Sequence, residues 1–265
     1  MAILDFLKGS KDTEPVDFTL SDYSHSNFGV IGLNNGAGAS TTAVSLAISL
    51  ARQNKKVLLL DADIFQPSLY FFFSGLVIPS EKSFIRYLAK ETKETDISIK
   101  VPGYDNLWLT TVSPQDQLEN LLSANVEQYR LMLKYIVDTF DFVIARVPYQ
   151  PYSTLFYETV QAMDRSFMVW DEQNDSAIKA QSVVNHFRNF SANAGHMNRV
   201  VINKRTKSPF DYDKIDELNC KLLAEIPLQK VAPKAKDSGE NLLAYSGVSR
   251  EYLAAIKQLS DNLLN

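Results

Sequence analysis

The stretch FGVIGLNNGAGAST, residues 28–41, decides the fold. A short apolar run ends in a glycine-rich turn, and helically spaced apolar residues follow from residue 40 to residue 52. In a turn between a strand and a helix, successive backbone N–H groups can point inward and hold an anion at the helix N-terminus. The stretch therefore predicts a phosphate-binding loop. The alternative interpretation is a tight turn that binds nothing.

The loop matches only part of the phosphate-binding motif G-x-x-x-x-G-K-[ST]. Gly38 and Ser40 stand at the positions of the second glycine and of the Mg²⁺-binding hydroxyl, whereas the first glycine, Gly32, lies one residue further from Gly38 than the motif requires. The lysine position holds Ala39. The backbone donors do not depend on that lysine, but the charge that reaches the β and γ phosphates is lost. We therefore expect weaker nucleotide binding and poor stabilisation of phosphoryl transfer.

Two acids end the next apolar run, VLLLDAD, at residues 57–63. A continuous apolar run indicates a parallel strand that is buried on both faces. Sites in α/β proteins lie at the carboxyl ends of such strands. Asp61 and Asp63 are therefore candidates to orient Mg²⁺ and an attacking water. The alternative is a pair of solvated acids before the next helix.

Strand-like and helical patterns alternate along the rest of the chain. We expect further strands at 106–112, 141–147, 166–170, 199–204 and 222–227, and helices at 67–75, 83–90, 126–139, 175–190 and 249–264. This alternation predicts an α/β fold with a doubly wound, mainly parallel sheet of seven or eight strands and helices on both faces. One domain, 28–265, would follow an N-terminal arm, 1–27. A (β/α)₈ barrel is disfavoured because of the early glycine loop.

The composition excludes several classes of protein. The chain has 265 residues, a net charge of −4 and one cysteine, so it cannot form an intrachain disulfide. Apolar residues make up 45% of it, which excludes collagen-like and disordered chains. The slight acidity disfavours nucleic acid as a partner, although residues 179–207 carry six basic side chains. Cys220 is expected in a helix as a small core residue.

Metal and membrane signals are weak. The three histidines lack ligand spacing, and no C-x-x-C pair is present, so we expect no zinc and no iron–sulfur cluster. The longest apolar stretch, 69–78, is about half the length of a membrane span. We therefore expect a cytoplasmic protein, at most peripheral to the inner face of the cell membrane. Within that stretch, residues 71–73 are three phenylalanines, expected in the core or, where exposed, at a partner site.

These segments together resemble the MinD/ParA family of P-loop ATPases, whose motifs read approximately KGGxGKTT and VLLxDxD. Here they read NNGAGAST, residues 34–41, and VLLLDAD. The resemblance continues through FDFVIARVP, 140–148, and VVINK, 200–204, and covers about residues 28–264. It implies ATP and Mg²⁺ as ligands. The implied nucleotide contacts are Asn35, Gly36, Ala37, Gly38, Ala39, Ser40, Thr41 and, at the adenine, Asn203. It further implies Mg²⁺ contacts from Ser40 and Asp61 and a water positioned by Asp63.

Three charged positions of the family are replaced in this chain. The family's signature lysine corresponds to Asn34, its Walker A lysine to Ala39 and its Walker B aspartate to Arg146. Loss of one preorganised electrostatic group typically slows a reaction by about 10²–10³-fold, so the resemblance implies weak ATPase activity or none. Two interpretations of Arg146 stay open: it replaces the missing lysine charge, or it pairs with an acid such as Asp61.

In its loss of a lysine from this loop, the chain also resembles the TadZ and CpaE branch, whose members help to localise pilus and secretion machinery. This implies a nucleotide-binding or pseudo-ATPase localisation and assembly factor. It would form a homodimer or pair with a related ATPase, and it would act with membrane-associated assembly proteins. A slow positioning ATPase and a scaffold that binds no nucleotide are the alternatives. Residues 1–11, MAILDFLKGSK, are similar to the start of MinE and predict weak membrane contact or packing on the domain.

Overall fold

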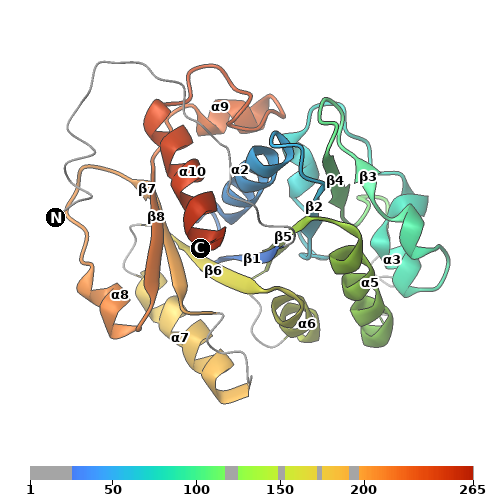
Figure 1. The fold of residues 1–265 in the computed structure, drawn as a ribbon, viewed down its shortest axis with the longest axis horizontal. Coiled ribbons are helices and arrows are strands. Elements are labelled where there is room, and N and C mark those ends of the chain that lie inside the picture. Colours follow the sequence, from blue (N-terminus) through green and yellow to red (C-terminus); the bar gives the residue numbers. More distant parts are fainter. Residues whose placement is uncertain (1–25, 117–124, 149–152, 172–174, 191–196, 265) are drawn as a thin grey trace.

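The computed structural model describes residues 26–116, 125–148, 153–171, 175–190 and 197–264 (Figure 1). The membrane contact predicted for residues 1–11 lies outside these ranges. The first strand begins at Ser26, two residues before the predicted start of the domain. No helix in the described ranges combines the length and the apolar character that a membrane span requires.

An eight-stranded sheet forms the middle layer, in the order β3-β4-β2-β5-β1-β6-β7-β8. The strands are β1 Ser26–Gly32, β2 Val57–Asp61, β3 Ile99–Lys100, β4 Leu107–Thr110, β5 Phe142–Val147, β6 Arg165–Trp170, β7 Arg199–Arg205 and β8 Lys221–Pro227. All neighbours pair in parallel except β3, which runs antiparallel to β4 at one edge. The predicted doubly wound, mainly parallel sheet is confirmed.

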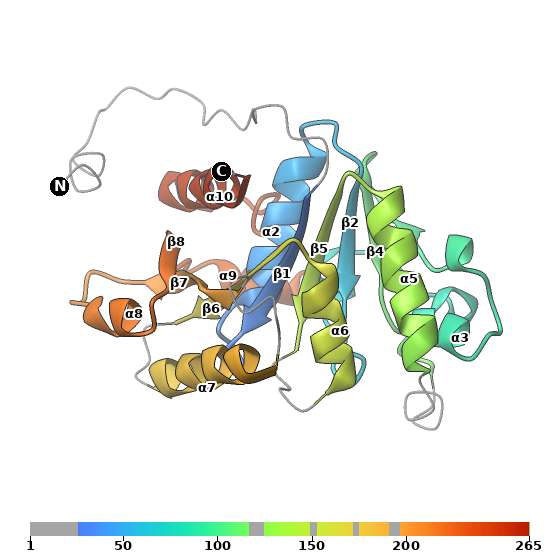
Figure 2. The ribbon, with the colours of Figure 1, turned by 60° about the horizontal axis from the view of Figure 1, so that its bottom comes forward.

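Helices cover both faces of the sheet. They are α2 Ala39–Ala51, α3 Phe84–Leu88, α5 Val126–Thr139, α6 Thr154–Ala162, α7 Asp175–Phe190, α8 Asp213–Glu217, α9 Ala232–Asp237 and α10 Arg250–Leu264. Figure 2 shows α2 and α10 on one face and α6 and α7 on the other. The chain leaves β1 for β2 on one side and later reaches β6 on the other side. The carboxyl end of β1 is therefore a topological switch point, where α/β proteins bind ligands.

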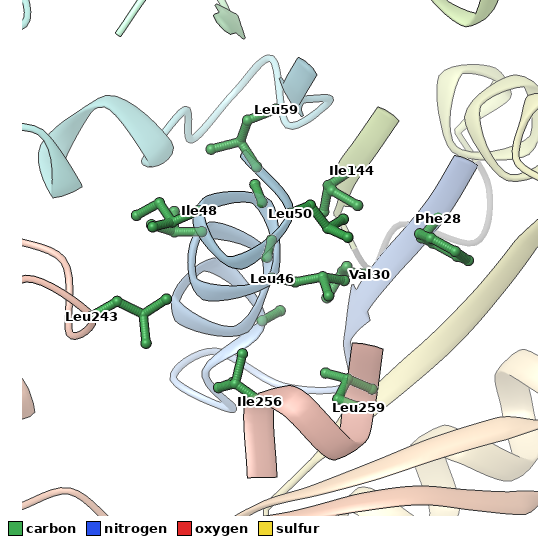
Figure 3. Packing of buried hydrophobic residues seen from close by; sticks show 14 of the residues in the cluster. Phe28, Val30, Leu46, Ile48, Leu50, Leu59, Ile144, Leu243, Ile256 and Leu259 are labelled. Carbon is green, nitrogen blue, oxygen red and sulfur yellow. The ribbon is translucent and has the colours of Figure 1, made fainter. Parts of the chain in front are cut away.

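Two separate apolar clusters hold the three layers together. Val30 joins the cluster of α2 and α10, whereas its neighbour Ile31 joins the cluster of α5, α6 and α7. This alternation follows from the two-residue period of a strand. Figure 3 shows side chains of β1, β2, β5 and α10 gathered around α2. The labelled side chains on α2 are Leu46, Ile48 and Leu50, and all three are fully buried. The helix that follows the glycine loop is thus held on two sides.

The segment after β2 differs from the prediction of a helix over 67–75. Only a 3₁₀ turn forms there, at Leu69–Phe72. The carboxylate of Asp61 accepts the backbone N–H groups of Ser68 and Leu69, which fixes the start of the turn. Gly75, at φ 78°, then redirects the chain. Of the three phenylalanines, Phe72 and Phe73 are buried and Phe71 is 52% exposed.

The helix predicted around Cys220 is also wrong. Cys220 lies between α8 and β8, where it is buried, so its expected place in the core is right. The elements β3, α6, α8 and α9 were not predicted from the sequence. β3, α8 and α9 have two, five and six residues, too few to show a clear period.

Candidate functional site

The glycine loop joins β1 to α2 through two residues with left-handed backbone. Gly36 has φ 82° and Gly38 has φ 96°. A Cβ on Gly38 would lie 1.9 Å from Nδ2 of Asn203, so only glycine fits there. The same Nδ2 donates a hydrogen bond to the carbonyl oxygen of Ala37 at 2.7 Å. The end of β7 thereby fixes the shape of the loop.

The N-terminus of α2 has backbone N–H groups that can bind an anion. Its N-cap, Gly38, offers no side-chain cap, and no acid lies in its first turn. The first backbone N–H groups of a helix lack partners within the helix and carry partial positive charge. The hydroxyl of Ser40 lies in this turn and pairs with the hydroxyl of Ser68 at 3.0 Å. The arrangement suits a phosphate held by main-chain donors.

A cavity of about 1300 Å³ opens at this edge of the sheet. It is lined by the whole loop, 32–41, by residues that follow β2, by residues at the carboxyl ends of β5, β7 and β8, and by α9. Of the predicted site residues, those at the cavity are Asn34, Asn35, Gly36, Ala37, Gly38, Ala39, Ser40, Thr41, Asp63, Arg146 and Asn203. Asp61 is completely buried and does not line the cavity.

Arg146 contacts Asp61, the last residue of β2, and Asp63, two residues further along the chain. The parallel register places it beside Asp61 on the neighbouring strand. Its Nη1 lies 3.6 Å from Oδ1 of Asp61 and forms a closer ion pair with Oδ2 of Asp63. Of the two interpretations of Arg146 that the sequence left open, the structure shows pairing with acids. The contact with Asp63 was not predicted.

Asp61 acts as an anchor for the chain that follows β2. Its Oδ2 accepts the backbone N–H of Ser68 at 2.6 Å and that of Leu69 at 2.9 Å. Burial raises the pKa of Asp61 to about 6, against the opposing effects of Arg146 and of the two backbone hydrogen bonds. Its Oδ1 is buried and lacks a hydrogen-bond partner within the described part of the chain. Arg146 and the two backbone N–H donors therefore favour the charged form of Asp61 against the effect of burial.

The acids do not fit a shared Mg²⁺ ion. Asp63 accepts the backbone N–H of Gln66 at 3.0 Å through Oδ1 and contacts Arg146 through Oδ2. The guanidinium thus supplies the positive charge that a metal would bring to both carboxylates. Among the residues that the structure describes, no three His, Cys, Asp or Glu side chains form a cluster that could hold a metal.

Asn34, predicted to correspond to the family's signature lysine, forms hydrogen bonds with two residues that follow β6. Its Nδ2 donates to Oδ2 of Asp171 at 3.1 Å, and its Oδ1 accepts from the hydroxyl of Ser176 at 3.2 Å. Sequence analysis missed Asp171, Ser176 and Ser68 as parts of the site. Asp171 directly follows an expected strand, which was a usable signal. The partners of the two serines depend on tertiary contacts.

Comparison with known proteins identifies the family. The model of the CobQ/CobB/MinD/ParA nucleotide binding domain matches residues 28–243. The chain belongs to this family. The MinD/ParA resemblance seen in the sequence is therefore confirmed, while the TadZ/CpaE branch stays a prediction.

Individual relatives agree with this assignment. The maintenance of carboxysome distribution protein A of Synechococcus elongatus is 33% identical over 50% of this chain and 53% of its own length. The ATPase GET3 of Ajellomyces dermatitidis is 27% identical over 48% of this chain and 32% of its own length. The chain thus spans about a third to about a half of the length of these relatives.

The fold is that of MinD. The cell division ATPase MinD of Pyrococcus furiosus superposes with a TM-score of 0.75 at 18% identity, over 90% of this chain and 98% of that chain. At this low identity the likeness shows the fold alone. Within that fold, the cavity of this chain lies beside the glycine loop that opens α2.

Proposed function

We propose that this MinD/ParA-family protein is a nucleotide-binding localisation or assembly factor that hydrolyses ATP slowly or not at all. The observation that carries the proposal is a phosphate loop with intact backbone geometry beside an acid, Asp63, that Arg146 already neutralises. The loop supports binding, and the ion pair argues against hydrolysis.

Binding would rest on main-chain groups. The backbone of Asn35–Thr41 would surround the phosphates, and the hydroxyls of Ser40 and Thr41 would add side-chain donors. Asn203 holds the loop through its amide nitrogen, and we assign its side-chain oxygen to the adenine amino group. Mg²⁺ would enter only with the nucleotide, because Asp61 and Asp63 already have partners.

Hydrolysis would be weak for two reasons. The lysine positions hold Asn34 and Ala39, so the developing negative charge on the phosphates lacks those two cations. Asp63, the acid that would position the attacking water, has both oxygens engaged. A base must be within reach of the proton that it accepts and free to take it. The ion pair with Arg146 opposes that role.

The partner would dock at the rim of the cavity. Phe71 and Leu228 line the cavity and are 52% and 48% exposed, and Phe65, two residues after Asp63, is 48% exposed. Exposed apolar side chains that gather at one edge favour a protein interface. We propose that this interface joins two copies of the chain, or this chain and a related ATPase. We further propose a membrane-associated machine, such as a pilus or secretion system, as the target.

Light scattering with and without ATP tests the proposal. A nucleotide-responsive dimerisation module would bind ATP and shift from monomer to dimer as it does so. Dimers that form without ATP and do not change when ATP is added would favour the alternative of a scaffold that binds no nucleotide. If ATP binds no better than at millimolar concentration and the mass stays unchanged, the nucleotide-dependent proposal fails.

A further inference from the structure

Lys204 lies beside the glycine loop and lines the same cavity. It follows Asn203 near the carboxyl end of β7 and is half-buried. Its Nζ is 3.9 Å from the position that a Cβ on Gly36 would take, and both residues line the cavity. A lysine ammonium therefore stands next to the backbone that would surround the phosphates.

A bulge in β7 brings this side chain to the loop. The pairs Ile202 with Glu225 and Arg205 with Pro227 leave one extra residue on β7. In a regular strand, the side chains of residues 203 and 204 would point to opposite faces of the sheet. The bulge re-aims them. As a result, Asn203 reaches Ala37 and Lys204 reaches the neighbourhood of Gly36.

The backbone of Lys204 is unfavourable for a lysine. Its φ is 57°, in the left-handed region that glycine and asparagine adopt more readily. No carboxylate within the described ranges forms an ion pair with it. The positive charge of Arg146, in contrast, is already matched by Asp61 and Asp63. Lys204 is thus a half-buried cation at the cavity that pairs with no carboxylate in the part of the chain that the structure describes.

We propose that Lys204 supplies the phosphate-contacting charge that Asn34 and Ala39 no longer provide. Its three N–H donors would reach a phosphate oxygen held by the loop. The inference rests on the proposed function, because its ligand is the phosphate group of the nucleotide. It concerns binding and assigns no part in hydrolysis to Lys204.

Substitutions at position 204 test this assignment with separate readouts for binding and folding. Lys204→Asn removes the charge but suits the left-handed backbone, and Lys204→Arg keeps the charge. Lys207→Asn is the matched control, since Lys207 is exposed on the same connection and does not line the cavity. The ligands are ATP, inorganic pyrophosphate and adenosine, each measured by equilibrium titration, and unfolding is followed by circular dichroism.

The expected result is a loss that is specific for phosphate. Lys204→Asn weakens binding of ATP and of pyrophosphate by about tenfold or more, as loss of a hydrogen bond to a charged group does. Lys204→Asn leaves the affinity for adenosine unchanged. Its melting temperature is the same as that of the natural protein or higher. Lys204→Arg and Lys207→Asn bind ATP as the natural protein does.

Other outcomes overturn the assignment in distinguishable ways. If the natural protein and Lys204→Asn bind ATP equally well, Lys204 does not contact the phosphate. The proposed function is then unaffected. A lowered melting temperature, or an equal loss of adenosine and ATP, shows that Lys204 only supports the fold. If the natural protein binds neither ATP nor pyrophosphate, the proposed function fails and this inference fails with it.

Discussion

The guanidinium of Arg146 forms an ion pair with the carboxylate of Asp63 across the carboxyl ends of the strands. The same Nη1 lies 3.6 Å from Asp61. In this three-residue cluster one base, Arg146, pairs with two acids beside the glycine loop. It explains how two carboxylates can be retained at a site without being available for metal binding or proton transfer.

Arg146→Met should destabilise the protein. The variant leaves Asp61 and Asp63 without their cation, and breaking a buried ion pair in this way typically costs about 3–5 kcal/mol. The lower end applies here, because the Arg146 side chain is 18% exposed. Urea unfolding at neutral pH measures the change. An unchanged free energy of unfolding would show that the cluster contributes nothing to stability.

Asp61 should make the protein less stable as the pH rises from about 4 to about 6. Its pKa is raised from 3.8 to about 6, so the folded state binds a proton over a range in which the unfolded state does not. Its contribution favours folding at low pH and is lost as the pH rises through the folded pKa. The difference is about 3 kcal/mol at most. Urea unfolding of the natural protein and of Asp61→Asn across this range isolates it; parallel curves would contradict the assignment.

Removal of Mg²⁺ should leave nucleotide binding unchanged. Asp61 and Asp63 already have partners, so neither carboxylate is free to bind a divalent ion. Titration of ATP in EDTA and in excess Mg²⁺ gives the two affinities. Binding that disappears in EDTA would show that the ion enters the site through other groups.

Gly38→Ala should disrupt the loop. The new Cβ would meet Nδ2 of Asn203, and the backbone, at φ 96°, costs a residue with a side chain about 1–2 kcal/mol. Gly103→Ala is the control, because Gly103 has φ 80° with nothing within 4 Å. We expect a lower melting temperature in both variants and loss of ATP binding only in Gly38→Ala. If both variants bind ATP equally well, the glycine loop does not form the nucleotide site.

Restoring hydrolysis should require changes at two positions. Ala39→Lys returns a cation to the loop, but Asp63 stays paired with Arg146. The double variant Ala39→Lys with Arg146→Asp frees Asp63 and should raise the rate of phosphate release by about 10²-fold or more. Phosphate release by the single and double variants checks this. A single Ala39→Lys variant that is already as fast would show that the ion pair does not limit hydrolysis.

Much of the fold could be predicted because the central strands are continuous apolar runs and the loop has glycines at fixed spacing. The predicted helix over 126–139 matches α5 in full. The 3₁₀ turn at 69–72 could not be predicted, since it depends on the buried carboxylate of Asp61. Lys204 was missed because its direction depends on a bulge set by pairing with β8.

The contacts of Arg146 could be predicted from the sequence only in part. Its place on a strand was predicted, and pairing with Asp61 was one of two open interpretations. The ion pair with Asp63 follows from the β2–β5 register and from the bend after Asp61, neither of which the sequence states.

The most direct test of the central claim is a titration with ATP in which bound nucleotide and released phosphate are measured on the same sample. The account predicts saturable binding at a single site per chain, with phosphate release at or barely above the background. Absence of saturable binding, or rapid release that Asp63→Ala abolishes, would contradict it.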